Sequence, residues 1–366
     1  MKILLVGEYS NVHWTLAEGL RAIGHDVTVI SDGDRWKGYR RDISLVRHGL
    51  STWGGIRYLA RLISLLPKMR GYDIVQLINP VFLDLKAERI MPFYRYLRRN
   101  NGKMVMGAFG VDLYWVKAGM DCKTFRYSDF NIGAQPRSNA DTTAMRAEWL
   151  QGAKGHLNQT IARDCDAIVS GLYENDASYR PHFTDKLHYI PFPIDIGLVT
   201  PKVRKTTEGI VKFFIGIQRA RSAYKGTDIM LRALRRVEAD SPGRCEVMVA
   251  ESVPFAKYVE MLNEGHVLLD QLYSYTPAMN ALQAMAQGMV VVGGGEPENY
   301  DILGEKELRP IVNVQPNEES VYKELANLVE HPSLIETLSR QSIEYISRYH
   351  SHVKVAEKYI DLYTQL

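Results

Sequence analysis

Short apolar runs alternate with amphipathic segments along the start of the chain. Residues 2–6 and 26–30 are apolar, and residues 14–23 between them place apolar side chains at helical spacing. Residues 56–66 repeat that spacing, and residues 73–78 return to an apolar run. The alternation predicts strand, helix, strand, helix, strand, because buried strands are short apolar runs and amphipathic helices have a period of about 3.6 residues. Such a series is typical of a parallel sheet covered by helices.

The same pattern continues and then starts again in the second half of the chain. Apolar runs at residues 104–107 and 167–170 predict more strands of the first sheet. A second series has a predicted helix at residues 227–238 and predicted strands at 211–216, 245–250, 267–270 and 289–292. From residue 317 onward the pattern is helical, with breaks at His331 and Pro332 and around His350. We therefore expect an α/β chain with two Rossmann-like domains.

Composition places the chain among globular proteins. Its 366 residues are 46% hydrophobic and 24% charged, which suits two folded domains. No apolar run approaches the roughly 20 residues that a membrane-spanning helix needs, and Glu8 interrupts the opening apolar run. We expect neither a spanning helix nor a secretory signal. Cys122, Cys165 and Cys245 lie far apart without a C-x-x-C pair, which favours reduced thiols in a cytoplasmic protein.

Charge is unevenly distributed around a formal net value of +3. Residues 1–100 contain 16 Lys and Arg against 9 Asp and Glu. The basic clusters are Arg35, Lys37, Arg40, Arg41 and Arg47, and then Arg95, Arg98, Arg99 and Lys103. Solvated surface charge is the commoner explanation. The functional one is contact with a lipid-phosphate acceptor or peripheral contact with an anionic membrane, at its inner face. Nucleic acid is not expected, because the cations lack interleaved aromatic residues.

A glycine turn after the predicted strand at residues 211–216 gathers cations. Arg219, Arg221 and Lys225 lie between that strand and the helix that starts after Gly226. Cations beside the free N–H groups of a helix N-terminus form a site where a diphosphate can bind. Taken alone, this motif is explained equally well by ordinary surface charge.

A second motif runs through residues 267–300 as strand, loop, helix, strand and glycine-rich turn. It contains QAMAQGMVV at residues 283–291 and GGEPE at residues 294–298. With the cation-bearing turn, it resembles the donor-binding segments of GT-B glycosyltransferases, above all the retaining nucleotide-sugar-dependent family 4 type (glycosyl transferases group 1). The patterns of that family are G-R-x-x-x-x-K-G-x-D, then E-A-M-A-x-G-x-P-V-V and G-G-x-P-E. The turn GHDV at residues 24–27 and the segment IPFPID at residues 190–195 also resemble family features.

The resemblance implies a fold and an activity. The fold would be GT-B, with two Rossmann-like domains whose parallel sheets face each other across a cleft and a C-terminal helix that crosses back to the first domain. The expected domains are residues 1–197 on the acceptor side, a linker at 198–209, residues 210–349 on the donor side, and the crossing helix at 350–366. The activity would be transfer of a sugar, a hexose by preference, from a nucleotide diphosphate donor to a glycan or lipid-linked acceptor in cell-surface polysaccharide or glycolipid synthesis. The nucleotide sugar would be a co-substrate, and no cofactor or metal is expected.

Donor-binding roles follow from the same resemblance. The residues concerned are Arg219, Arg221, Lys225, Tyr275, Gln283, Gly294, Gly295, Glu298 and Asn299. Lys225 and Arg221 would neutralise the leaving diphosphate, as catalytic residues do when charge develops in the transition state, and Arg219 competes with Arg221 for that role. Tyr275 and Gln283 stand where the family usually has glutamates. A subset with a D-Q-L strand end does not need the earlier glutamate, and Asp270 opens such a D-Q-L here.

Acceptor-side candidates lie in the first domain. Asp112 ends GAFGVD, which resembles an H-G-x-D loop of the family with Phe109 in place of His, and we weigh a catalytic role for it equally with a structural cap. Glu8, Asn11 and His13 follow the first strand, where α/β sheets bind ligands, although a lone histidine there is more often a hydrogen-bonded structural residue. Residues 117–143, polar and irregular, form a candidate acceptor-side loop, because long loops are usually functional or disordered.

Three other interpretations fit parts of the sequence. Asp32-Gly33-Asp34 is a possible divalent-metal motif, but Asp and Gly directly after a strand favour a turn. A Rossmann dehydrogenase is disfavoured, since the turn after the first strand lacks the later glycines of G-x-G-x-x-G. The main alternative is a GT-B-shaped protein that binds a nucleotide or glycan without turnover, because Tyr275 and Gln283 replace both glutamates.

Overall fold

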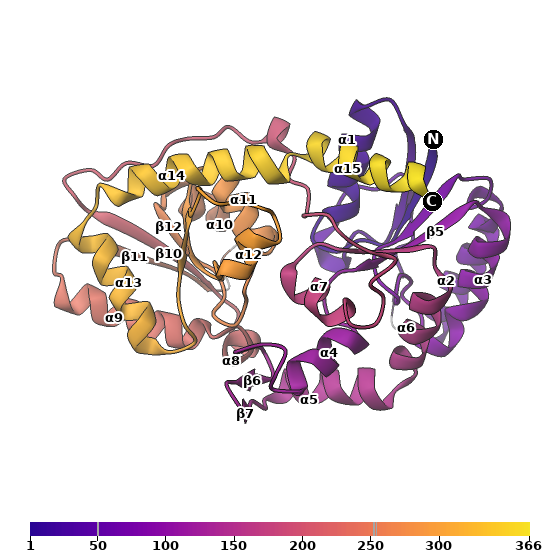
Figure 1. Ribbon diagram of the computed structural model, residues 1–366, viewed down its shortest axis with the longest axis horizontal. Helices are drawn as coiled ribbons and strands as arrows, with labels where there is room; N and C mark the ends of the chain where they lie inside the picture. Colours follow the sequence, from indigo (N-terminus) through magenta and orange to yellow (C-terminus); the bar gives the residue numbers. More distant parts are fainter. Residues whose placement is uncertain (50, 252, 254) are drawn as a thin grey trace. The chain divides into compact units, whose positions relative to one another are not determined.

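A computed structural model describes residues 1–49, 51–251, 253 and 255–366 (Figure 1). By its contacts the chain divides into two compact units, and each is described by itself. The first unit comprises Met1–Lys117, Met145–Asp195 and Ser351–Leu366, and the second comprises Ala118–Ala144 and Ile196–His350. The division differs from the predicted domains in residues 118–144, which pack with the second unit although the chain enters and leaves them from the first.

The first unit is built on one parallel sheet. In the described residues its strand order is β3-β2-β1-β4-β5-β8-β9, and every pairing is parallel. The strands are β1 (Lys2–Val6), β2 (Asp26–Ser31), β3 (Ile43–Ser44), β4 (Ile74–Leu77), β5 (Lys103–Ala108), β8 (Ala167–Ser170) and β9 (Leu187–Tyr189). Because helices cover both faces of such a sheet, β1 buries four apolar side chains in a row. The predicted strands at residues 2–6, 26–30, 73–78, 104–107 and 167–170 are confirmed.

Helices cover that sheet, and the last of them is formed by the C-terminal residues of the chain. They are α1 (Val12–Ala22), α2 (Thr52–Leu65), α3 (Met91–Asn100), α6 (Ala153–Asp164), α7 (Tyr173–Tyr179) and α15 (His352–Gln365). Helix α1 ends before Gly24, whose φ of +89° is a conformation that glycine adopts readily. Helix α15 lies beside α1 (Figure 1). A Cβ on Gly19 would lie 2.2 Å from the backbone oxygen of His352, so glycine permits this close packing.

The second unit repeats the architecture with a smaller parallel sheet. The described strand order is β11-β10-β12-β13-β14. The strands are β10 (Val211–Ile217), β11 (Cys245–Glu251), β12 (Val267–Leu269), β13 (Val290–Gly293) and β14 (Ile311–Asn313). Its helices are α8 (Ser222–Lys225), α9 (Thr227–Asp240), α10 (Phe255–Glu264), α11 (Met279–Ala286), α12 (Pro297–Asp301), α13 (Glu318–Glu330) and α14 (Leu334–Tyr345). Phe213, Val267 and Val290, from three neighbouring strands, are fully buried in its core.

Residues 118–144, here called the strap, are an ordered part of the second unit. Helix α4 (Leu113–Met120) leads into the strap, β6 (Asn131–Ile132) and β7 (Gln135–Pro136) form an antiparallel hairpin within it, and α5 (Ala140–Arg146) leads back. Asn131 is fully buried and donates to the carbonyls of Phe125, at 2.9 Å, and Gly133, at 3.0 Å. Apart from this hairpin the segment is largely irregular between α4 and α5, as predicted, but it packs with the second unit and not with the first. Its acceptor-side role stays a prediction.

The predicted linker also carries a structural anchor. Arg204 is buried, and its backbone N–H donates to the Ser339 hydroxyl at 2.8 Å while its guanidinium donates to the carbonyl of Asn263. These contacts tie residues 196–209 to the second unit. A polar composition predicted a linker here, but the buried Arg204 fixes this segment on the second unit.

Candidate functional site

The loop between β10 and α9 presents the predicted cations at the carboxyl end of a strand. Lys225 closes the short helix α8 and is half-buried, and its carbonyl accepts the backbone N–H of Leu272 at 2.9 Å. Gly226 follows with φ +72°, and a Cβ there would lie 2.6 Å from Cβ of Leu272. Glycine is therefore required for the chain to turn into α9 against the loop after β12. The N–H groups of the first turn of α9 have no acceptor within the helix.

Arg219 and Arg221 are held differently on this loop. The Arg219 side chain is 86% exposed and forms an ion pair with Glu251 at the end of β11. Arg221 stacks on the ring of Tyr224 with its guanidinium carbon 4.8 Å from the ring centroid. Since a carboxylate already neutralises Arg219, Arg221 is the cation of the two that better suits an anionic ligand.

The loop after β12 brings a carboxylate close to Lys225. Asn280, near the start of α11, donates to Asp270 at 3.0 Å. Burial raises the pKa of Asp270, while the charge of Lys225 and the Asn280 hydrogen bond oppose that rise. Gln283 is exposed and lies one turn after Asn280, so both side chains are on one helix face. The predicted ribose-binding position therefore lies on the helix face that borders the Lys225 loop.

Tight packing accounts for the glycines that follow β13. A Cβ on Gly294 would lie 2.3 Å from the backbone oxygen of Ser274, and a Cβ on Gly295 would lie 2.8 Å from Cγ2 of Ile311. The N–H of Gly295 donates to Asn313 at 3.1 Å. The close approach that these glycines permit is thus to the loop after β12 and to β14. Their approach to a ligand stays a prediction.

The strap supplies a residue that the motifs did not reveal. Arg126 donates to Glu296 at 2.7 Å and forms an ion pair with Glu298, with a second hydrogen bond to Glu298 at 3.1 Å. Its guanidinium carbon also lies 5.0 Å from the ring centroid of Tyr275, and its backbone N–H donates to the Tyr275 hydroxyl at 2.7 Å. One arginine therefore links both acidic residues of the GGEPE turn to the tyrosine that replaces the family's earlier glutamate.

A second arginine of the strap, Arg137, contacts the loops that follow β10 and β12. Arg137 lies 3.3 Å from the ring centroid of Tyr273 and donates to the carbonyl of Ala223 at 3.0 Å. It also donates to the carbonyls of Ser128, at 3.0 Å, and Asp129, at 3.1 Å, within the strap. The strap consequently contacts all three loops that follow β10, β12 and β13.

Contacts within this cluster favour the charged forms of Arg126 and Glu296. Burial raises the pKa of Glu296, but hydrogen bonds from Tyr127, Asn313 and Gln315 and the charge of Arg126 outweigh burial and hold that pKa below its ordinary value. The hydrogen bond to Glu298 raises the pKa of Arg126. Both groups are therefore ionised at neutral pH. The cluster is a fixed, charged feature of the second unit.

The Asn299 side chain is engaged in packing within the second unit. Its buried side chain donates to the hydroxyl of Tyr345 in α14 at 3.2 Å. The contact anchors α12 to the packed interior of the unit. We therefore leave Asn299 out of the donor site that is proposed below.

In the first unit, the predicted residues after β1 form hydrogen bonds with other groups of the same unit. Glu8 is buried and accepts the backbone N–H groups of His13, at 3.2 Å, and Trp14, at 2.9 Å, at the start of α1. His13 is fully buried, with Nδ1 2.9 Å from the Gly7 carbonyl and Nε2 3.3 Å from Gln76. Burial raises the pKa of Glu8 to about 8 and lowers the pKa of His13 to about 3. Both groups are mostly uncharged near neutral pH.

Asn11 and Asp112 complete the first-unit candidates. Asn11 has φ +69° and donates to the Thr15 hydroxyl at 3.3 Å. Asp112 is fully buried, and it accepts the Trp115 N–H at 2.9 Å and the Tyr179 hydroxyl at 2.7 Å. Burial raises the pKa of Asp112 to about 6. Of the two roles left open by the sequence, the structural cap at the start of α4 is the one these contacts support.

The Asp-Gly-Asp segment forms a turn, as predicted. Gly33 has φ +78° and Asp34 has φ +59°, and the N–H of Asp34 donates to Asp32 at 3.0 Å. The second carboxylate accepts the Ser10 N–H at 2.9 Å and pairs with Lys37 at 2.7 Å. Within the described residues no group of three or more His, Cys, Asp or Glu is arranged to hold a metal ion.

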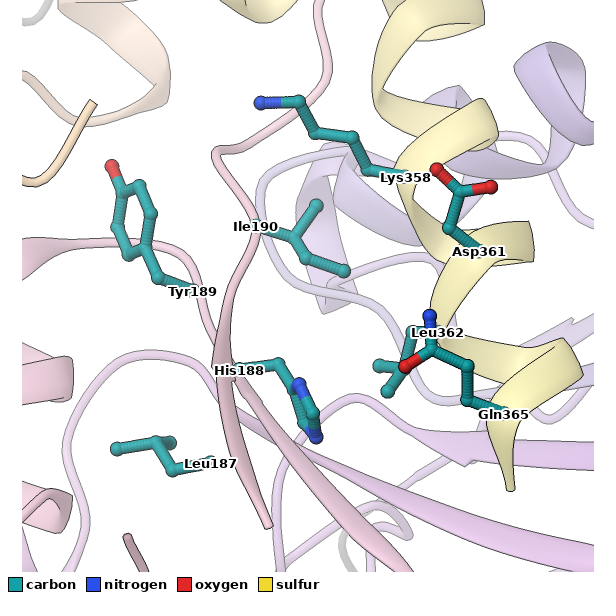
Figure 2. Close-up of a pocket in the computed structure, with 8 residues that line it drawn as sticks. All are labelled: Leu187, His188, Tyr189, Ile190, Lys358, Asp361, Leu362 and Gln365. Atoms are coloured by element: carbon teal, nitrogen blue, oxygen red, sulfur yellow. The ribbon is translucent and has the colours of Figure 1, made fainter. Parts of the chain in front are cut away.

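A separate cavity of about 410 Å³ lies in the first unit between β9 and α15 (Figure 2). His188 lines it from β9, and Lys358, Asp361 and Gln365 line it from α15. Burial lowers the pKa of His188 and the pKa of Lys358. None of the predicted donor or acceptor residues lines this cavity, so it does not belong to the candidate site.

Solved structures with the same fold cover the whole chain. Sucrose-phosphate synthase from Thermosynechococcus elongatus has a TM-score of 0.64 at 12% identity, covering 100% of this chain and 99% of that chain. HepE from Anabaena, in complex with UDP and glucose, has a TM-score of 0.57 at 11% identity, with 100% of both chains covered. WaaG, a glycosyltransferase involved in lipopolysaccharide biosynthesis, has a TM-score of 0.55 at 14% identity, again over 100% of both chains.

No protein-family model and no curated protein matches the sequence. At these identities the structural likeness shows the fold, which is the GT-B fold of glycosyltransferases, and the predicted fold class is confirmed. None of the described helices has the length and apolar character required to cross a membrane.

Proposed function

We propose that this protein is a retaining, metal-independent glycosyltransferase that binds a nucleotide diphosphate sugar on its second unit. The observation that carries the proposal is the loop after β10, where the exposed Arg221 and the half-buried Lys225 precede the N-terminus of α9. The GT-B fold and the UDP and glucose bound by HepE favour a nucleotide-sugar ligand. The acceptor class that we propose is a glycan or lipid-linked sugar, in cell-surface polysaccharide or glycolipid synthesis.

Breaking the sugar–phosphate bond leaves negative charge on the departing diphosphate. Lys225 and Arg221 would neutralise that charge, and the free N–H groups at the start of α9 would donate hydrogen bonds to phosphate oxygens. These groups are part of the folded chain before the donor binds, so little reorganisation is needed as charge develops. With two cations and a helix N-terminus at the diphosphate, the mechanism needs no metal ion.

The remaining contacts would orient the donor. Gln283, exposed on α11, would accept a hydrogen bond from a ribose hydroxyl. Glu298, which Arg126 orients through an ion pair, would accept hydrogen bonds from sugar hydroxyls through its remaining lone pairs. The Tyr275 hydroxyl is occupied by the Arg126 N–H, so Tyr275 would pack against the donor pocket without supplying a charge.

Donor hydrolysis by the purified protein tests the proposal. We expect slow release of a nucleoside diphosphate from one member of a panel of UDP-, ADP- and GDP-sugars. Lys225→Ala should reduce that rate by roughly 100-fold or more, because a fixed charge at the leaving group is lost. Lys323→Ala, at an exposed position on α13, is the matched control and should leave the rate unchanged. Equal rates for the two variants would contradict the proposed role of Lys225.

A non-catalytic binding protein is the second candidate function. It is favoured by one observation, that Tyr275 and Gln283 leave both usual glutamate positions without a carboxylate. Gln283→Glu separates the two functions, because a restored carboxylate should strengthen ribose binding by about tenfold. If nucleotide affinity rises while neither form releases product from any donor, the binding function holds and the transferase function is rejected.

A further inference from the structure

Helix α2 (Thr52–Leu65) of the first unit carries an apolar stripe on its exposed side. Trp53 is 74% exposed, Ile56 is 52% exposed and Ile63 is 54% exposed. Their spacing of three and seven residues places them on one helix face. Tyr58 and Leu62, on the other side of the helix, are buried in the unit. Single exposed apolar side chains are common, but three large ones aligned on a helix mark an interaction surface.

Cations flank this stripe without compensating acids. Arg57 and Arg61 are both exposed and lie one helical turn apart beside Trp53 and Ile56. Residues 35–70 contain nine Lys and Arg and a single acid, Asp42. Asp42 already accepts a hydrogen bond from Arg21 at 2.6 Å. Within the described part of this segment, the ion pair of Lys37 with Asp34 is the one salt bridge that its cations form.

The same segment exposes another aromatic residue among cations. Trp36 is 82% exposed in the short helix η1 (Arg35–Lys37). The turn is fixed by left-handed backbone at Asp34, with φ +59°, and Arg35, with φ +60°. Tryptophan beside arginine and lysine is a combination typical of the interface between a membrane and water, where the ring enters the headgroup layer and the cations meet lipid phosphates.

Charge selects the occupant of this surface. A second copy of the chain would set one uncompensated cluster of cations against another, which opposes self-association. An anionic surface instead gains from every exposed cation, and it accepts an apolar stripe that lies in its plane. We propose that α2 docks on an anionic lipid bilayer, with Trp53, Ile56 and Ile63 entering the interface and Arg57 and Arg61 contacting lipid phosphates. This inference is independent of the proposed transfer reaction.

Vesicle flotation of the full-length protein tests the docking. The probes are phosphatidylcholine vesicles with and without about a third of phosphatidylserine. Wild-type protein should float with the anionic vesicles, should float weakly with the neutral ones, and should be released as salt is raised, because screening weakens charge contacts with lipid. Loss of two juxtamembrane cations in Arg57→Ala/Arg61→Ala should weaken partitioning by roughly 30-fold.

A second variant removes the apolar stripe and leaves the charges. Trp53→Ser/Ile56→Ser/Ile63→Ser changes exposed side chains, so circular dichroism should match wild type while flotation is lost. Leu198→Ser is the apolar control, since Leu198 is 81% exposed but lies outside α2. Arg235→Ala/Lys323→Ala is the charge control on exposed helix positions of the second unit. Both controls should float like wild type.

Two results would overturn the proposal. One is a folded wild-type protein that does not float with anionic vesicles at low salt. The other is a stripe variant that floats as well as wild type. If wild-type protein is instead dimeric by light scattering and the stripe variant is monomeric, with no flotation of either, a second copy covers α2 and the bilayer is excluded.

Discussion

The two sheets of this chain have similar parallel topology but differ in the chemistry at the carboxyl ends of their strands. After β1, Glu8 and His13 are buried and bonded to backbone and core groups. After β10, Lys225 and Arg221 remain at least partly exposed. The polar side chains after β1 therefore fix helix α1, while the loop after β10 keeps cations that can bind a ligand. Position at a sheet edge alone does not identify a binding residue.

Connection length explains much of this difference. Only residues 7–11 separate β1 from α1, so Glu8 lies close enough to accept the N–H groups that α1 leaves unsatisfied. Residues 218–226 separate β10 from α9, and no side-chain hydrogen bond caps α9. The N-terminus of α9 is consequently still available to an anion.

The largest effect should follow from removing the internal acceptor in the first unit. Glu8→Ala leaves the buried N–H groups of His13 and Trp14 without their partner, and we expect a loss of about 2–4 kcal/mol in the free energy of unfolding. Urea unfolding measures this loss. Glu8→Gln keeps an acceptor oxygen and should lose less. Nucleotide binding by the folded fraction should not change. A weakened nucleotide affinity would contradict a purely structural role for the residues after β1.

The pH dependence of the first unit should show the same buried acid. The folded pKa of Glu8, about 8, lies above the ordinary value of 4.5, so above pH 4.5 the folded state holds a proton that the unfolded chain has lost. Stability therefore falls as pH rises, until the pH passes about 8. The lowered pKa of His13 acts below its ordinary value of 6.5. Between these values, from pH 6.5 to 8, Glu8 should dominate.

Urea midpoints measured across that window give the test. We expect the unfolding free energy of wild-type protein to decrease by about 1–2 kcal/mol from pH 6.5 to pH 8. Glu8→Gln cannot titrate and should give a nearly flat profile. A wild-type profile that rises with pH would contradict the buried, protonated state of Glu8.

A smaller effect is expected from the charged cluster of the second unit. The Arg126 side chain is 54% exposed and that of Glu298 is 23% exposed, so water screens their ion pair. A double-mutant cycle with Arg126→Ala and Glu298→Ala should give a coupling energy of about 1 kcal/mol in thermal or urea unfolding. Arg232 with Glu318, a pair on exposed helices of the same unit, is the matched comparison and should couple more weakly. Zero coupling for Arg126 would mean that the strap is held by other contacts.

Local sequence patterns predicted many of the strands and helices. Continuous apolar runs such as residues 2–6 and 167–170 predicted strands because a sheet that is covered on both faces buries every side chain. Short or partly polar elements were missed, among them β3 (Ile43–Ser44), β9 (Leu187–Tyr189) and α3 (Met91–Asn100). Two- and three-residue strands have no readable period. Helix α3 contains several arginines and buries only Tyr94 and Leu97.

The donor-side motifs singled out Lys225, Gln283 on α11 and the GGEPE turn, but the sequence could not reveal the strap. Arg126 lies 170 residues from Glu296, and nothing in its local sequence distinguishes it from surface arginines. A possible signal was the clustering of Phe125, Tyr127 and Phe130 in a segment taken as polar, since all three are buried. The glycines of the GGEPE turn were ambiguous for another reason. Packing against Ser274 and Ile311 requires glycine at Gly294 and Gly295 whether or not a ligand binds there.

Binding of nucleoside diphosphates by titration calorimetry tests most directly whether the second sheet edge is the ligand-binding one. UDP, ADP and GDP would be titrated into wild-type protein, Lys225→Ala, and Glu8→Gln as the first-edge control. We predict that at least one nucleotide binds, that Lys225→Ala weakens its affinity by roughly tenfold or more, and that Glu8→Gln binds like wild type. Equal affinity of Lys225→Ala and wild type, or no binding of any of the three nucleotides, would contradict the assignment.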